Sequence, residues 1–276
     1  MQLKQSVARG LLVAASLVLG ACGGSGGSDS DTVDARGLDS GDASPCAAGS
    51  GEIRVVNAIS SSQTIAVDVP DTSADFGSMR FGEASGLLDV PVCTYKIPVT
   101  VTDAGGTQTL YVPDVQIGDG AQTTLFATGT DLAQDSVGFA VVNPEATIPE
   151  GQIEVQLVHV ASAAPSFNVY ALPPDATSPE QGLQLAQAYS EQGFQRTAYS
   201  TPVNIPPGTY RFVFTTVDGQ QVYESGPMGI ALPTRNGARR YQIAVLDAPD
   251  MTDGAIISLL LLDETGAQTA LGNGLH

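Results

Sequence analysis

Basic, histidine and tryptophan residues are scarce in this sequence. It has 11 lysines and arginines against 29 aspartates and glutamates, two histidines and no tryptophan, and its formal net charge is −18. Proteins that bind nucleic acid need basic side chains to displace the counterions around phosphates, and docking on anionic lipid by charge needs the same residues. The composition therefore excludes a nucleic-acid partner, and we interpret the acidity as a device for solubility.

Catalytic and cofactor-binding motifs are also missing. The sequence contains no Gly-x-Ser-x-Gly elbow, His-Glu-x-x-His pair, phosphate-binding loop or dinucleotide fingerprint. Several aspartates lie between residues 29 and 42, but they lack the alternate spacing and the final glutamate of an EF-hand loop. We therefore expect no metal and no cofactor.

Residues 1–21 have the pattern of a lipoprotein signal peptide. Lys4 and Arg9 precede an apolar run at 11–19, which is about half of the ~20 residues that a transmembrane helix needs. A lipobox, Leu-Gly-Ala, then stands directly before Cys22. We predict that Cys22 is lipidated and becomes the new N-terminus; the alternative is an ordinary signal peptide followed by an incidental cysteine.

Lipidation of Cys22 makes the membrane a partner through an acyl anchor. Each buried methylene group contributes about 0.8 kcal/mol, so two or three acyl chains attach a protein permanently. The segment resembles those of bacterial lipoproteins. For a Gram-negative host the resemblance implies an outer-membrane lipoprotein, periplasmic or surface-facing, because Gly23 and not aspartate follows the cysteine.

Residues 22–51 are rich in glycine, serine and aspartate and contain few apolar side chains. A segment with so little to bury is typical of a disordered tether. A flexible chain of this length has a mean reach on the order of 25–30 Å. We therefore expect the folded part of the protein to be held away from the membrane.

From residue 53 onward, short apolar runs are broken by Pro, Gly, Asp and Asn at intervals of about ten residues. This rhythm predicts an all-β fold of the antiparallel sandwich type. The run 256–262 is apolar on both faces and short, which indicates a central buried strand and not a membrane segment. The strands expected in the first part of the chain are 53–59, 65–69, 95–102, 109–115, 122–128 and 137–142.

The same order of patterns occurs twice along the chain. We interpret this as a duplication that gives two tandem sandwich domains, 52–146 and 147–276. The second copy has additional residues within 171–203, and we expect them to form either a short helix or an edge strand. The clearest matching stretches are 54–60 with 156–162, and 89–95 with 204–210.

Two motifs carry a resemblance to a known family. The stretch 158–170 reads Val-His-Val-Ala-Ser-Ala-Ala-Pro-Ser-Phe-Asn-Val-Tyr, and Ile-Pro-Pro-Gly-Thr-Tyr follows at 205–210. These motifs are similar to the bacterial extracytoplasmic repeat known as domain of unknown function 4397. The resemblance spans residues 53–265 and implies an immunoglobulin-like sandwich in each copy, with no catalytic residues and no established activity. The first copy departs from the family pattern at Asn57, at residues 61–63 and at Cys93.

Three cysteines are present, and lipidation of Cys22 leaves Cys46 and Cys93 as a pair. An even pair in an exported protein predicts a disulfide, which would stabilise the fold by up to ~4 kcal/mol. The alternative is two free thiols. A zinc site is disfavoured, because two cysteines without nearby histidines fall short of a tetrahedral ligand set.

Tyr95 and Tyr210 occupy equivalent positions in the two copies, after Pro-x-Cys-Thr and Pro-Pro-Gly-Thr. A tyrosine at such a corner places its ring in the core while its hydroxyl binds a nearby backbone group. We therefore predict that both tyrosines determine the fold.

His159 is the only histidine apart from His276, which is the last residue. A Ser-His-Asp hydrolase needs a base beside its nucleophile, so His159 is the residue on which an envelope hydrolase of peptides, esters or glycans would depend. Its counterpart in the first copy, Asn57, is able to make similar polar contacts. This equivalence favours a hydrogen-bonded structural histidine.

Taken together, these patterns predict a lipid-anchored protein of the cell envelope that acts as a non-catalytic binding or structural module. Loops on a rigid scaffold are the usual place for binding sites. We expect the partner to be an envelope protein or a glycan. An envelope hydrolase that uses His159 is the alternative.

Overall fold

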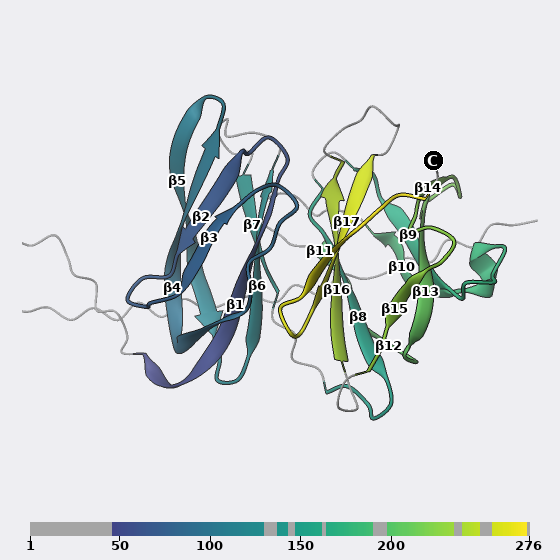
Figure 1. Cartoon of the computed structure of the whole chain (residues 1–276), viewed down its shortest axis with the longest axis horizontal. Helices are drawn as coiled ribbons and strands as arrows, with labels where there is room; N and C mark the ends of the chain where they lie inside the picture. Colours follow the sequence, from purple (N-terminus) through teal and green to yellow (C-terminus); the bar gives the residue numbers. More distant parts are fainter. Residues whose placement is uncertain are drawn as a thin grey trace, which may run out of the picture. The chain divides into compact units, whose positions relative to one another are not determined.

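Most of the described chain is β-strand, because β-branched side chains suit a pleated strand, while Gly, Pro and Asp interrupt it between strands (Figure 1). The computed structural model describes residues 46–129, 137–142, 147–161, 164–189, 198–234, 239–248 and 256–274, with the backbone alone for 137–142, 188–189 and 198. Within these ranges the single helical element is the 3-10 turn η1 (Pro179–Gln181), and no helix has the length and hydropathy to span a membrane. The predicted all-β fold class is confirmed.

The first half of the chain forms two sheets that share one strand. β1 lies between β4 and β6, and β7 pairs with β6. In the other sheet, β4 lies between β2 and β5, and β3 pairs with β2. β4 belongs to both sheets because residues 88–92 pair with β1 and residues 93–103 pair with β5. The strands are β1 (Ala47–Ile59), β2 (Thr64–Asp68), β3 (Asp75–Met79), β4 (Leu88–Asp103), β5 (Gly106–Ile117), β6 (Gln122–Gly129) and β7 (Val137–Val142).

The second half repeats this plan with shorter pieces. β8 lies between β16 and the short strands β11 and β12, and β17 and β18 continue the sheet. In the other sheet β9 lies between β10 and β13, and β13 also pairs with β14 and β15. The strands are β8 (Ile153–His159), β9 (Phe167–Leu172), β10 (Leu183–Tyr189), β11 (Ala198–Tyr199), β12 (Val203–Ile205), β13 (Gly208–Thr216), β14 (Gln221–Glu224), β15 (Ile230–Leu232), β16 (Arg239–Asp247), β17 (Ile257–Asp263) and β18 (Gln268–Leu271).

One pairing in each half corrects the expected antiparallel arrangement. β1 pairs with β6 in parallel, and β8 pairs with β16 in parallel. A tight hairpin joins only antiparallel strands, whereas parallel partners need a long connection between them. Turn residues in the sequence therefore do not reveal these two pairings.

The structure also corrects the end of the predicted tether and describes the insertion. β1 begins at Ala47, so residues 47–51 are strand and not tether. The side chains of 47–50 are exposed, and their composition does not signal a strand because they bury nothing. Within the insertion, η1 is followed by the edge strand β10, which pairs with β9.

Each half has its own apolar core. In the first half, Ile53 and Leu125 of one sheet pack against Ile97 of the other. In the second half, Ile243 packs against Phe214. Most residues of β1, β6, β8, β16 and β17 are nevertheless buried on both faces of their strand. Successive side chains of a strand point to opposite faces, so these strands must have a second packing partner.

Both predicted tyrosine corners are present. The hydroxyl of Tyr95 donates to the backbone oxygen of Pro91 at 2.9 Å, and that of Tyr210 donates to the backbone oxygen of Pro206 at 2.7 Å. Burial raises the pKa of both phenols. The first bond lies within β4, where this strand passes from one sheet to the other, and the second bond spans the turn between β12 and β13.

Candidate functional site

Of the residues that were predicted to carry function, Cys22 lies outside the described residues. Cys46 and Cys93 form a disulfide, with their Cα atoms 4.7 Å apart. Cys46 directly precedes β1, and Cys93 lies where β4 passes from one sheet to the other. The disulfide therefore joins the start of the folded chain to the strand that both sheets share.

His159 is the last residue of β8 and is 1% exposed. Its ring stacks on Phe167 with centroids 5.4 Å apart, and its Nε2 lies 3.4 Å from the backbone oxygen of Pro165. Burial lowers the pKa of the imidazole, while the Pro165 carbonyl and Asp247 act in the opposite direction. A general base must reach the proton that it removes from a substrate. This ring is enclosed by protein, which favours a structural role.

Asn57 occupies the matching position in β1. His159 lies opposite Val245 of β16, and Asn57 lies opposite Ala127 of β6. The Nδ2 of Asn57 donates to Ser62 Oγ at 2.8 Å, and its Oδ1 accepts from a backbone N–H two residues later at 3.0 Å. Both positions are therefore occupied by a buried polar side chain at the end of the strand.

The second packing partner of β1 and β6 is the sheet of β8, β16 and β17. Val56 and Phe126 of the first half form one apolar cluster with Val158, Ala244 and Leu260 of the second half. The alternate residues of the same strands line the separate cores. We call this contact between the halves the junction.

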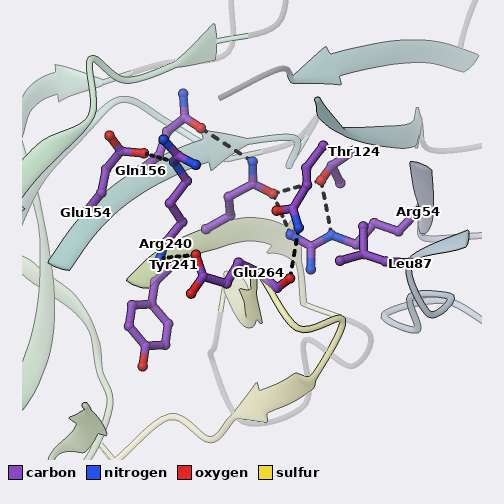
Figure 2. Close-up of a pocket in the computed structure, with 10 residues that line it drawn as sticks. Arg54, Leu87, Thr124, Glu154, Gln156, Arg240, Tyr241 and Glu264 are labelled. Atoms are coloured by element: carbon purple, nitrogen blue, oxygen red, sulfur yellow. Dashed lines mark hydrogen bonds and ion pairs between the residues drawn. The ribbon is translucent and has the colours of Figure 1, made fainter. Parts of the chain in front are cut away.

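A polar layer continues the junction, and the side chain of Arg54 lies within it (Figure 2). Its Nε donates to Thr124 Oγ1 at 3.0 Å, its Nη1 to the backbone oxygen of Asp263 at 2.7 Å, and its Nη2 to Gln242 Oε1 at 2.8 Å. Gln242 also accepts from Thr124 Oγ1 at 2.9 Å and donates to Gln156 Oε1 at 3.4 Å. All three guanidinium nitrogens are thus bonded, two of them to the second half.

Arg54 carries its charge inside the protein. It is 4% exposed, and burial lowers its pKa to about 10, with the negative charge of Asp263 opposing the shift. At neutral pH the guanidinium is therefore still protonated. A buried charge is tolerated only where hydrogen bonds and nearby opposite charge replace its hydration, and the acceptors of the second half supply them.

Two ion pairs lie beside this network on the second half. Arg240 Nε is 3.0 Å from Glu154 Oε1, and Arg239 pairs with Asp263. Glu154 is 2% exposed, and its Oε2 has no hydrogen-bond partner within the part of the chain that the structure describes. Scarce basic side chains are thus gathered at the junction, where they neutralise buried carboxylates.

Figure 2 shows the pocket that the side chains of the polar layer line together with Glu154 and Arg240. Gln122 closes one side of it by donating from Nε2 to Glu52 Oε2 at 2.7 Å and to the backbone oxygen of Glu264 at 2.9 Å. The free space has room for about one water molecule. It is too small for an organic substrate.

The junction brings equivalent positions of the two halves together. Arg54 and Thr124 face each other in the parallel pair β1–β6, and Gln156 and Gln242 do so in the pair β8–β16. These four residues are the ones that form the hydrogen-bonded chain across the junction. The contact therefore has the self-complementary form of an isologous interface between two subunits, although both sides belong to one chain.

None of these four residues was predicted from the sequence to carry function. The sequence gives one indication of the junction. The strands expected at 53–59 and within 156–162 have apolar side chains at successive positions, where a strand with one exposed face would alternate. Such a strand needs two packing faces. Which surface covers the second face depends on contacts distant in sequence, and local periodicity does not report them.

The chemistry of the junction is that of a structural network. In the described ranges no group of three His, Cys, Asp or Glu side chains is placed to hold a metal ion. The amides and guanidinium of the polar layer bond to one another and not to a free surface. The arrangement holds the two sandwiches in one relative position.

Comparison with known families identifies part of the chain. Residues 51–170 match the family described as "Domain of unknown function (DUF4397)". The matched stretch is less than half of the chain. The DUF4397 match begins within β1, covers the rest of the first sandwich and β8, and ends within β9 at Tyr170. The expected continuation of the resemblance to residue 265 stays a prediction.

Two solved structures show distant likeness to the chain. One is that of "a putative adhesin from Bacteroides ovatus", with 10% identity, a TM-score of 0.26, and coverage of 82% of this chain and 96% of that one. The other is a fimbrial assembly protein from Parabacteroides distasonis, with 14% identity, a TM-score of 0.23, and coverage of 81% and 98%. Both TM-scores are too low for these likenesses to bear on the function of this chain. No curated protein matches it.

Proposed function

We propose that this protein is a lipid-anchored module of the cell envelope that binds an envelope protein or glycan without catalysing a reaction. The anchor is Cys22, residues 23–45 are the tether, and the two sandwiches, which begin with β1 and β8, form the displayed part. The sequence supports the anchor through the lipobox before Cys22.

The junction is the observation that carries the non-catalytic part of the proposal. Arg54, Thr124, Gln156 and Gln242 use their polar atoms to hold the halves together, and the pocket between them has room for about one water molecule. His159 is enclosed at the end of β8. A rigid pair of sandwiches offers its loops and outer sheets for binding.

The disulfide supports the envelope location. Disulfides persist in secreted and periplasmic proteins and are rare in reducing compartments. The folded chain contains the Cys46–Cys93 disulfide, and Cys46 is exposed. Because an exposed disulfide is accessible to reductants, it persists in an oxidising environment such as the one outside the cytoplasm.

The anchor is tested by membrane fractionation of the whole protein and of its Cys22→Ser variant. The wild type should sediment with the membranes, and the variant should appear folded in the soluble fraction. A variant that remains tightly bound to membranes would refute the lipid anchor.

Binding is tested with the soluble Cys22→Ser protein on arrays of envelope glycans and envelope proteins, beside a panel of ester, peptide and glycoside substrates. We expect saturable binding to a defined ligand and no turnover. The control is the same protein with His159→Ala added. Turnover that His159→Ala abolishes while folding is retained would establish the hydrolase instead.

A further inference from the structure

We propose that the Cys46–Cys93 disulfide is a mechanical clamp that carries the load of the tether into the core of the first sandwich. The proposal rests on the proposed function in one respect, which is that the protein is anchored through the chain before Cys46. A disulfide generally stabilises a folded protein. The proposal goes further, because it states that this disulfide resists force applied from the N-terminal side of the chain.

The start of β1 is weakly held without the disulfide. The side chains of residues 47–50 are all exposed, and the first buried residue of the strand is Gly51. These residues are attached through backbone pairing, as in Ala47 with Val92, and through the bond from Gly120 N to Ser50 O at 2.8 Å. Each such bond contributes only about 0.5–1.5 kcal/mol. A pull on the preceding chain would break them one after another.

The disulfide moves the load to a better-supported strand. It lies one step beyond the Ala47–Val92 pair, so it closes the end of the β1–β4 ladder. Cys93 packs against the first apolar core, and the residues that follow it in β4 pair with β5 and then with β2. Tyr95, two residues away, fixes the same corner through its bond to Pro91. A force that enters at Cys93 is therefore shared between both sheets.

The position of Cys46 favours this role over stapling of an internal loop. β1 begins at the residue directly after Cys46, so this cysteine lies where the strand starts. Any load on the preceding chain must pass through Cys46 before it reaches a hydrogen bond of β1. A covalent bond at this point shields the exposed segment 47–50 from the load.

The test is single-molecule pulling of the whole mature chain with Cys22→Ser, which leaves Cys46 and Cys93 as the only thiols. One handle is at the C-terminus, and the other is either at the N-terminus or inserted in the turn between β4 and β5, after Ala104. Each attachment is measured with the disulfide intact and after reduction by dithiothreitol. Circular dichroism after reduction checks that the reduced protein remains folded.

We expect reduction to lower the unfolding force when the protein is pulled from its N-terminus. An early extension of about 3.3–3.6 Å per residue released should then appear, from the peeling of residues 47–51. The unfolding force from the β4–β5 turn should change less, because that path does not pass through the disulfide. Equal losses from both attachments would show general stabilisation and overturn the clamp, and so would no loss from either.

If the reduced protein proves unfolded, the double variant Cys46→Val and Cys93→Val is pulled in its place at a temperature where it folds. The same difference between the two attachments is expected. These outcomes are independent of ligand binding and of membrane fractionation. Failure of the clamp and failure of the proposed function are therefore distinguishable.

Discussion

Arg54 Nη2 in the first sandwich donates to Gln242 Oε1 in the second at 2.8 Å. The apolar part of the junction attracts the two sheets without specifying their register, because hydrophobic attraction is not directional. The bonds of Arg54 are directional and connect β1 to β16 and to the end of β17. We infer that Arg54 fixes the relative position of the sandwiches.

Arg54→Ala should destabilise the protein strongly. The substitution removes three hydrogen bonds in a buried site. Gln242 Oε1 keeps its bond to Thr124 but loses the charged donor, and the backbone oxygen of Asp263 loses the guanidinium as well. Loss of about 3 kcal/mol or more of unfolding free energy is expected, measured by urea denaturation followed by circular dichroism. The matched control is Arg80→Ala, an exposed arginine in the same half, which should change the free energy by less than about 0.5 kcal/mol. Similar small effects of both variants would contradict the role of Arg54.

Gly51→Ala should disturb the point at which β1 enters the fold. A Cβ at this position would lie 2.4 Å from the backbone oxygen of Gly118 and 2.9 Å from that of Ala121. Backbone atoms yield little, so we expect a loss of about 1–3 kcal/mol, as for other overpacked sites. Gly86→Ala is the control, because a Cβ there meets nothing within 4 Å. If thermal unfolding shows the two variants to be equally stable, the close approach of β1 to the 118–121 turn is not rigid.

The tyrosine corners allow a comparison between equivalent positions. Tyr95→Phe removes a part-buried bond to Pro91, whereas Tyr210→Phe removes an exposed bond to Pro206. The first variant should cost about 1 kcal/mol of unfolding free energy and the second less, because water replaces an exposed partner more easily. Urea denaturation of both variants measures the difference. A larger loss for Tyr210→Phe would contradict the claim that the more buried hydrogen bond contributes more to stability.

Local patterns in the sequence predict much of the fold. The expected strands at 122–128 and 137–142 lie within β6 and β7, since alternating or continuous apolar runs bounded by turn residues report local burial. The strand β3 is missed because Asp75-Phe-Gly-Ser-Met has no such alternation and contains Gly77 at a φ of 65°. Its strand character comes from pairing with β2.

The residues of the candidate site also fall into those that the sequence predicts and those that it does not. Counting cysteines was enough to pair Cys46 with Cys93, and the internal repeat was enough to match His159 with Asn57. Arg54 was not predicted, because its acceptors Gln242 and Asp263 are nearly two hundred or more residues away in sequence. No local pattern shows that the outer faces of two sandwiches meet, and therefore a buried arginine in β1 was not distinguishable from an exposed one.

His159 should make the stability of the protein depend on pH. The unfolded chain binds a proton at this histidine with an ordinary pKa of about 6.5, whereas burial lowers the pKa in the folded state. As the pH falls, the unfolded state therefore binds more protons at this histidine than the folded state does. The stabilising contribution of the neutral imidazole is present above about pH 6.5 and is lost as the pH falls below that value.

The matched variant is His159→Asn, which places the residue of the equivalent position, Asn57, at the end of β8. Urea denaturation at about pH 8 and about pH 5, on either side of the ordinary histidine pKa, should show a larger loss of unfolding free energy in the wild type than in the variant. Carboxylates titrate in both proteins, so their contribution cancels in the comparison. An identical pH dependence would mean that the folded protein accommodates a charged imidazole at this site, and a buried structural histidine would no longer explain its position against Phe167.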